Sequence, residues 1–288
     1  MKRMIFAGML ALALGGAGLV AQKGKDKGAP AQGQAAQPKG PMPKSKGEQD
    51  ALVALFNAQR ENKPDEVITD AESLLSKYAD TDFKDTAQFM EAQAYQQKGD
   101  AAKAQVYAEQ AVTTNPKNFQ ASLMVAELIN RGTRDHDLDK EEKLSRADKY
   151  ANDSIASINA AEKPNPQITD QQWDEAKKDM IAQAHDALGM SALTRKNYDA
   201  AVTEFKTAVD GAAHPEPAYE VRLASAYNDA KKYDEAIATA QKVMDEPQTP
   251  TQIKQIAQSI RAQASVAKQK AAGGANPAAP AQVEIKQQ

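Results

Sequence analysis

Small and apolar residues recur among polar ones along residues 48–272 at intervals that predict pairs of helices. Three stretches show the pattern best, because each reads as the end of one helix, a polar turn and the start of a second helix. These stretches are 94–104, 192–201 and 226–236. Recurrence of one motif along a chain predicts stacked repeats. A last amphipathic helix, with Ile253, Ile256 and Ile260 on one face, is expected over residues 251–272.

The recurring motif resembles the tetratricopeptide repeat (TPR), a 34-residue helix–turn–helix unit with small or aromatic residues at fixed places. The match is strongest in the unit that starts at Ala182, where the family's Leu-Gly pair falls on Leu188 and Gly189. The units that start at Asp85 and Pro217 also follow the pattern. The resemblance implies an all-α fold, namely a right-handed α-solenoid of about five TPR-like repeats with a C-terminal capping helix.

The resemblance also implies the domain organisation. The expected units lie near 48–81, 85–118, 119–160, 182–215 and 217–250, and the cap at 251–272. The first and third units match the pattern less closely, and the third contains a turn at 131–144 that is longer than usual. Helices in such units approach closely only where the contact residues are small, with aromatic residues filling the spaces between turns. The expected repeat-packing residues are Ala92, Tyr95, Ala104, Gly189, Ala201, Phe205, Tyr227 and Ala236.

In this family the first helix of each unit lines a concave groove, so the resemblance nominates a partner-binding surface. Its expected members are Leu52, Phe56, Gln59, Phe89, Gln93, Gln96, Leu123, Glu127, Asn130, Met190, Leu193 and Asn228, with Asp186, Val221 and Ser225 at equivalent positions. This lining is apolar and rich in amides, and about half of it is expected to pack between units instead. Some family members grip a partner's terminal carboxylate with a clamp of Lys, Asn and Arg. Only Arg222 matches that clamp here, so we do not expect this chain to grip a partner's terminal carboxylate in this way.

A capping box at Thr169 and Gln172 predicts that a helix begins there. It would lengthen the first helix of the fourth unit by about three turns. Trp173, the only tryptophan, lies in this extension. We favour the interpretation that Trp173 packs against the long segment 131–144, and the alternative is a contact with a partner.

Composition excludes several classes of protein. Aromatic residues are 5% of the chain and much of the apolar content is alanine, as expected for a thin helical core rather than a β fold. The net charge is −3, from 36 basic and 39 acidic residues, so nucleic acid is not an expected partner. There is no cysteine, which excludes disulfides and thiol catalysis.

No pattern of residues predicts catalysis, a cofactor or a metal site. Asp135, Asp137 and Asp139 alternate as at the start of a calcium loop, but Lys140 and Arg146 stand where such a loop needs glycine and glutamate. A turn exposed to solvent explains these charges. We therefore expect a protein that is not an enzyme and that binds no cofactor.

The two ends of the chain have different compositions from the repeats. Residues 1–21 begin with Lys2 and Arg3 and continue as an apolar run, which predicts a signal peptide and an exported, periplasmic or extracellular protein; an uncleaved membrane anchor is the alternative. Residues 22–47 are rich in Lys, Gly, Pro and Gln and are expected to be a disordered linker, as is the tail 273–288.

These features lead to two hypotheses for function. In the first, an exported scaffold or adaptor binds a protein or peptide segment in its groove, within an assembly of the cell envelope. In the second, the basic arm 22–47 tethers the protein to cell wall or a membrane surface, and the solenoid is a spacer. The sequence does not identify the partner.

Overall fold

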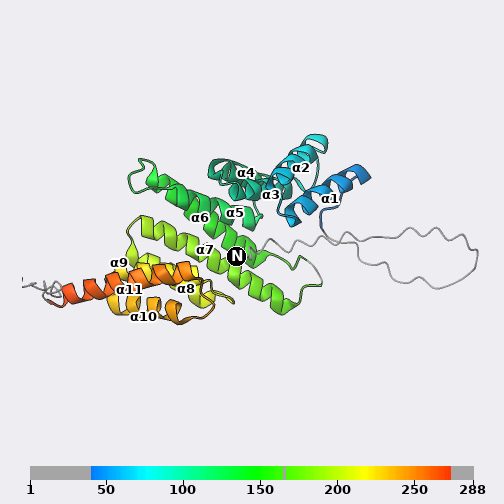
Figure 1. Ribbon diagram of the computed structural model, residues 1–288. Helices are drawn as coiled ribbons and strands as arrows, with labels where there is room; N and C mark the ends of the chain where they lie inside the picture. The colour runs from blue at the N-terminus through cyan, green and yellow to red at the C-terminus, as the bar shows by residue number, and fades with distance from the viewer. Residues whose placement is uncertain (1–39, 165–166, 274–288) are drawn as a thin grey trace, which may run out of the picture.

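The computed structural model describes residues 40–164 and 167–273, and this part of the chain consists of helices and their connections (Figure 1). The helices there are α1 (Lys46–Arg60), α2 (Pro64–Lys77), α3 (Lys84–Gln97), α4 (Ala101–Thr114), α5 (Phe119–Gly132), α6 (Lys140–Ala160), α7 (Asp170–Thr194), α8 (Tyr198–Gly211), α9 (Pro217–Asp229), α10 (Tyr233–Asp245) and α11 (Thr251–Ala271). The predicted signal segment 1–21, most of the linker 22–47 and nearly all of the tail 273–288 lie outside the described residues.

Neighbouring helices pack on one another in chain order, as Figure 1 shows from the blue to the red end of the array. Each helix packs on the next, and in addition α5 packs on α7 and α9 packs on α11. The predicted all-α solenoid is confirmed. Five helix pairs, from α1–α2 to α9–α10, correspond to the five expected units, and α11 covers the end of the array.

The turn between the two helices has the same geometry in four of the five pairs. It is centred on Asn62, Gly99, Lys196 or Lys231, and all four residues have φ between 57° and 80°. In each turn the amide of the following residue donates to a carbonyl five residues back, for example Asp100 N to Tyr95 O at 2.9 Å. This is the Schellman way of ending a helix, and it requires the left-handed conformation that costs glycine least.

The third pair departs from this turn, as the sequence predicts. Residues 133–139 form a longer connection between α5 and α6. Its three alternate carboxylates are paired with lysines: Asp135 lies 2.7 Å from Lys196, and Asp137 and Asp139 lie 3.0 and 2.9 Å from Lys143. The segment is therefore held by ion pairs to α6 and to the end of α7.

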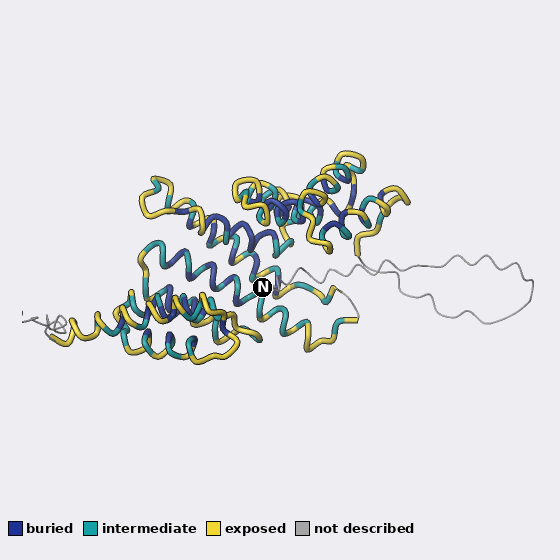
Figure 2. Tube along the Cα trace, in the orientation of Figure 1, coloured by how far each residue is buried: buried dark blue, intermediate teal, exposed yellow. Residues whose placement is uncertain are grey.

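The core is a ribbon of alanines with a few large side chains, and Figure 2 shows buried residues along the inner faces of the helices. Of the predicted packing residues, all are buried except Tyr227, which is half-buried and packs against the cluster around Phe205 and Leu223. Gly189 is a close-approach position, because a Cβ there would lie 2.6 Å from the Phe205 ring.

The predicted extension of α7 is confirmed, but the interpretation of Trp173 is wrong. Both bonds of the capping box at Thr169 are present, and α7 has 25 residues. The segment 131–144 contacts the opposite end of α7, where Lys140 Nζ lies 3.3 Å from the Thr194 carbonyl oxygen. Trp173 is about 30 Å from that point along the helix. It is half-buried, with Lys177 Nζ 5.8 Å from the centre of its ring, and Asp170, three residues earlier, pairs with Lys163 just beyond α6.

The first helix starts two residues before the predicted boundary at 48, because the preceding residues are part of the fold. The Ser45 hydroxyl accepts a hydrogen bond from the Glu48 amide at 3.1 Å and caps α1. The buried Glu48 carboxylate in turn accepts from the Lys44 amide and from the Thr81 hydroxyl, both at 2.6 Å. The ordered repeat region thus includes Lys44 and Ser45.

Candidate functional site

The residues nominated for partner binding lie on the first helices α1, α3, α5, α7 and α9. Three of the twelve are buried and do not line a surface: Leu52 is 2% exposed, Leu123 5% and Asn130 6%. Leu52 and Leu123 belong to the apolar core between units. These three nominations are corrected, because burial between helices leaves no side-chain atom for a partner to contact.

Asn130 has a structural role in place of the predicted one. Its side-chain amide donates to the Ala187 carbonyl at 2.7 Å, and its oxygen accepts from the Ser191 hydroxyl at 2.8 Å. Both partners are on α7. Asn130 therefore joins the third unit to the fourth through two buried hydrogen bonds, and removing one partner would leave the other unsatisfied.

The other nine nominated residues are half-buried. They are Phe56, Gln59, Phe89, Gln93, Gln96, Glu127, Met190, Leu193 and Asn228. We call these nine residues, together with Gln183, Arg222 and the largely buried Asp186 with which Arg222 pairs, the first-helix surface. Phe56 packs against the core between the first two units, Phe89 packs against the core between the second and third units, and both residues are half-buried. The first-helix surface thus combines aromatic and aliphatic side chains with amides and charges.

Polar side chains connect one first helix to the next across this surface. Gln59 on α1 donates to Gln93 on α3 at 3.0 Å. Gln183 on α7 donates to Glu127 on α5 at 2.6 Å. Arg222 on α9 pairs with Asp186 on α7 at 2.7 Å. These contacts join the first helices of the first two units, and separately those of the last three units.

The electrostatic environment is most perturbed in the middle of the surface. Burial raises the pKa of Glu127, against the opposing effect of Arg131, which lies 3.1 Å away. Burial also raises the pKa of Asp186 to about 6, against the opposing effect of Arg222. Perturbed carboxylates of this kind gather at functional sites and also in structural ion pairs. Here each carboxylate faces an arginine, so the network is close to neutral.

Gln183 was not identified from the sequence as part of the surface. It lies one helical turn before Asp186, and the i, i+3 spacing places the two side chains on the same face of α7. Gln183 lies within the expected unit 182–215, and its spacing of three residues from Asp186 was the signal that could have identified it. Arg222 was noticed only as a remnant of the carboxylate clamp, whereas in the structure it neutralises Asp186.

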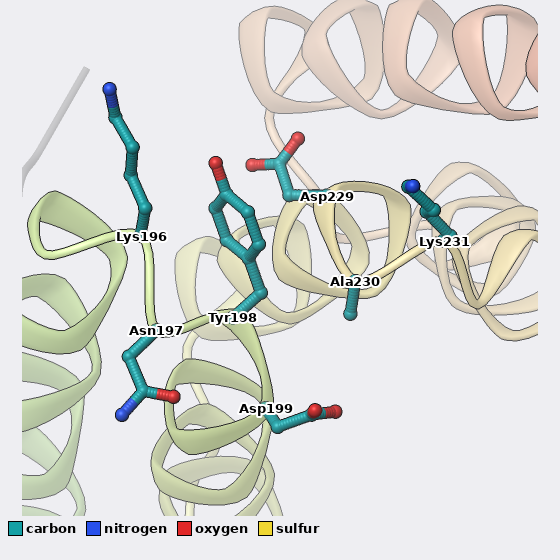
Figure 3. Close-up of a pocket in the computed structure, with 7 residues that line it drawn as sticks. All are labelled: Lys196, Asn197, Tyr198, Asp199, Asp229, Ala230 and Lys231. Atoms are coloured by element: carbon teal, nitrogen blue, oxygen red, sulfur yellow. The ribbon is translucent and has the colours of Figure 1, made fainter.

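Two hollows occur away from the first-helix surface. The one in Figure 3 has a volume of about 410 Å³ and lies between the turns 196–199 and 229–231. Its side chains point in different directions, and two of its charges are paired elsewhere, Lys196 with Asp135 and Asp199 with Lys232. The second, of about 340 Å³, includes Tyr150 and Arg146. Neither brings together groups suited to catalysis.

Among residues 40–164 and 167–273, no three His, Cys, Asp or Glu side chains are placed to hold a metal ion. Within those ranges, none of the helices combines the length and the apolar character needed to cross a membrane.

Comparisons with known proteins point to one repeat family. Two family models, both described as tetratricopeptide repeat, match residues 86–118 and 187–250. No curated protein sequence matches the chain.

Solved structures with a similar arrangement of helices include a double mutant of MamA RS-1. It is 15% identical, over 70% of this chain and 94% of that one, with a TM-score of 0.51. A thermophilic TPR protein from Thermus thermophilus is 18% identical over 74% and 98% of the two chains, with a TM-score of 0.46. A tetratricopeptide repeat protein from Parabacteroides merdae is 15% identical over 81% and 94%, with a TM-score of 0.41. At such identities the likeness to MamA concerns the fold alone.

Proposed function

The chain belongs to the tetratricopeptide repeat family of interaction scaffolds, and from this premise we propose that it binds a segment of a partner protein along its first-helix surface, without catalytic activity. The observation that carries the proposal is that first helices of different units contact one another through side chains of this surface. Side chains of α1 and α3, of α5 and α7, and of α7 and α9 contact one another across unit boundaries. A stacked array of this kind presents an extended surface suited to an extended segment.

The chemistry of the surface indicates the kind of segment. Phe56 and Phe89 offer partly exposed rings at the α1–α3 end. The Gln59–Gln93 bond uses the amide nitrogen of Gln59 and the oxygen of Gln93, and it leaves the Gln59 oxygen and the Gln93 nitrogen outside that bond. Such groups can accept from and donate to the peptide groups of a bound segment. An apolar side chain of the partner would then lie against the two rings.

The charged middle of the surface contributes less to affinity than these contacts. Glu127, Asp186, Arg131 and Arg222 already neutralise one another in pairs. Binding is therefore expected to depend on side-chain contact and only weakly on salt.

A pair of substitutions tests the role of the surface. Phe89→Ala combined with Gln93→Ala should weaken capture of the partner at least tenfold, because it removes an aromatic contact and an amide. The free energy of unfolding should fall by about 1 kcal/mol for the loss of the Gln59–Gln93 bond and by about 1–2 kcal/mol for the loss of the Phe89 ring, which packs partly against the core, and the helical content should stay the same. The measurement is affinity capture from native envelope extract, with mass spectrometry to identify and quantify what binds.

The matched control is Val106→Ala with Gln110→Ala on α4, the second helix of the same unit. Both residues are exposed there, and Val106 is 52% exposed. The control should capture the partner as the natural protein does. Equal capture by both double variants would contradict the proposal.

The basic arm is the alternative binding element, and the structure shows how to remove it cleanly. Lys44 and Ser45 hold the start of α1, and Lys44 also lies 3.2 Å from Asp82. A deletion of residues 22–47 would therefore damage the first unit. Deletion of residues 22–39 removes four of the six lysines of the arm and spares the cap. Loss of capture in that variant, with the surface substitutions silent, would favour a tether over a scaffold.

Export to the cell envelope is part of the proposal, and it rests on the sequence of residues 1–21. Lys2 and Arg3 followed by an apolar run are typical of a secretory signal. The mature protein should then begin near Gln22. Intact-mass measurement of the protein recovered from the envelope tests this, and a full-length chain there would indicate an uncleaved anchor.

A further inference from the structure

Glu91 on α3 is a buried acidic residue that the proposed function does not use. It is 1% exposed, and neither oxygen of its carboxylate has a hydrogen-bond partner of normal geometry. A buried carboxylate is costly in its charged form, because water no longer solvates it and a single nearby hydroxyl, that of Tyr107 on α4, replaces only part of the lost solvation. Such a residue destabilises the fold unless it is neutral.

The other helix pairs show what this position normally holds. Glu91 comes directly before Ala92, the small residue at which α3 approaches its neighbours. The residues directly before the corresponding small residues Ala126, Gly189 and Ala224 are Val125, Leu188 and Leu223. Three pairs therefore place an aliphatic side chain where the second pair places a carboxylate, which makes Glu91 an exception to the packing rule of its own repeat.

The groups around Glu91 come from the helices on either side of it. The Tyr107 hydroxyl on α4, by hydrogen bonding to the carboxylate, and the charge of Lys103 on α4 act to lower the pKa of Glu91, and the charge of Glu72 on α2 acts to raise it. Tyr107 stacks on Tyr95, with the ring centres 5.2 Å apart, and Lys103 Nζ lies 4.8 Å from the centre of the Tyr95 ring. Burial outweighs these effects and raises the pKa of Glu91 to about 7.

We propose that Glu91 makes the contact of α3 with α2 and α4 sensitive to pH, so that the first two units are firmly packed when the carboxyl group is protonated and loosen when it ionises. The inference stands on the burial of Glu91, the absence of a cation paired with its carboxylate among the described residues, and its place in the repeat. It does not depend on the proposed partner binding.

The direction of the effect follows from proton linkage. The carboxyl group binds its proton more tightly in the folded chain than in the unfolded one, since its pKa is about 7 in the former and about 4.3 in the latter. Below about pH 4 both states are protonated and there is no penalty. As pH rises from there to about 7, the unfolded state loses its proton first and stability falls, and above about 7 the penalty is complete.

Hydrogen exchange of the full chain, followed by mass spectrometry at pH 5 and pH 8, tests the inference. The readout is the opening equilibrium of α3 amides in a variant relative to the natural chain at the same pH. Glu91→Gln and Glu91→Leu should both lower the opening equilibrium constant of the α3 amides relative to the natural chain. This reduction should be tenfold to about a hundredfold larger at pH 8 than at pH 5, because neither variant has the proton linked to unfolding. The α9 and α10 amides should not change.

Two features of the design make the result decisive. Glu109→Gln, a half-buried carboxylate on α4 that pairs with Arg146 at 2.8 Å, is the control and should keep the pH dependence of the natural chain. Asp186 also titrates in this range, but it is present in every variant and cancels in the ratio. If α3 opens with the same pH dependence in both Glu91 variants as in the natural chain, the inference is overturned.

Discussion

At the scale of single residues, the stability of the array depends on how closely side chains allow the helices to approach. Gly189 and Phe205 illustrate this, because the aromatic ring occupies the space that a Cβ on residue 189 would need. Phe205 is fully buried and lies in the core shared by α7, α8 and α9, so its ring cannot move aside without disturbing other contacts. The glycine is therefore required for space, since its backbone is ordinary helix.

The smallest possible change at this position should already be harmful. Gly189→Ala should lower the free energy of unfolding by about 1–3 kcal/mol through overpacking, although alanine is the better helix former. Urea unfolding followed by circular dichroism measures the change. Gly132→Ala, at the exposed end of α5 where a Cβ meets nothing within 4 Å, is the control and should not be destabilised. An equally stable Gly189→Ala chain would show that the ring adapts.

At the scale of helices and turns, much of the fold was predictable from the sequence, since local patterns determine it. Small residues at fixed spacing predicted the helix pairs, and the capping box predicted the start of α7. Side-chain partners between units were not predictable, because they depend on how helices far apart in sequence are set against each other. Asn130 was assigned to the binding surface on spacing alone, whereas its two partners on α7 bury it.

Trp173 and Glu91 show the same limit in two other ways. The position of Trp173 followed from the antiparallel packing of α6 and α7, which places the start of α7 far from segment 131–144. Glu91 has the spacing of a core residue and the chemistry of a surface residue, and only the structure shows that spacing prevails. Of the candidate surface, nine of twelve nominated residues are half-buried on the first helices.

At the scale of the whole molecule, the chain divides into regions of opposite charge. The described residues include 29 Lys and Arg against 37 Asp and Glu, a net charge of −8. Residues 22–39 carry Lys23, Lys25, Lys27 and Lys39 against Asp26. In the solenoid each unit packs only against the units next to it in the sequence. A partner bound along several first helices would therefore link units that do not contact one another directly and would stabilise them together.

Site-specific photo-crosslinking tests the central claim, that the partner lies along the first-helix surface, most directly. A photoreactive benzophenone amino acid placed at Phe89 should form a covalent adduct with the partner in cells. The same amino acid at Val106, exposed on α4 of the same unit, should form none. Adducts at Val106 and not at Phe89 would contradict the account, because the partner would then lie along the second helices.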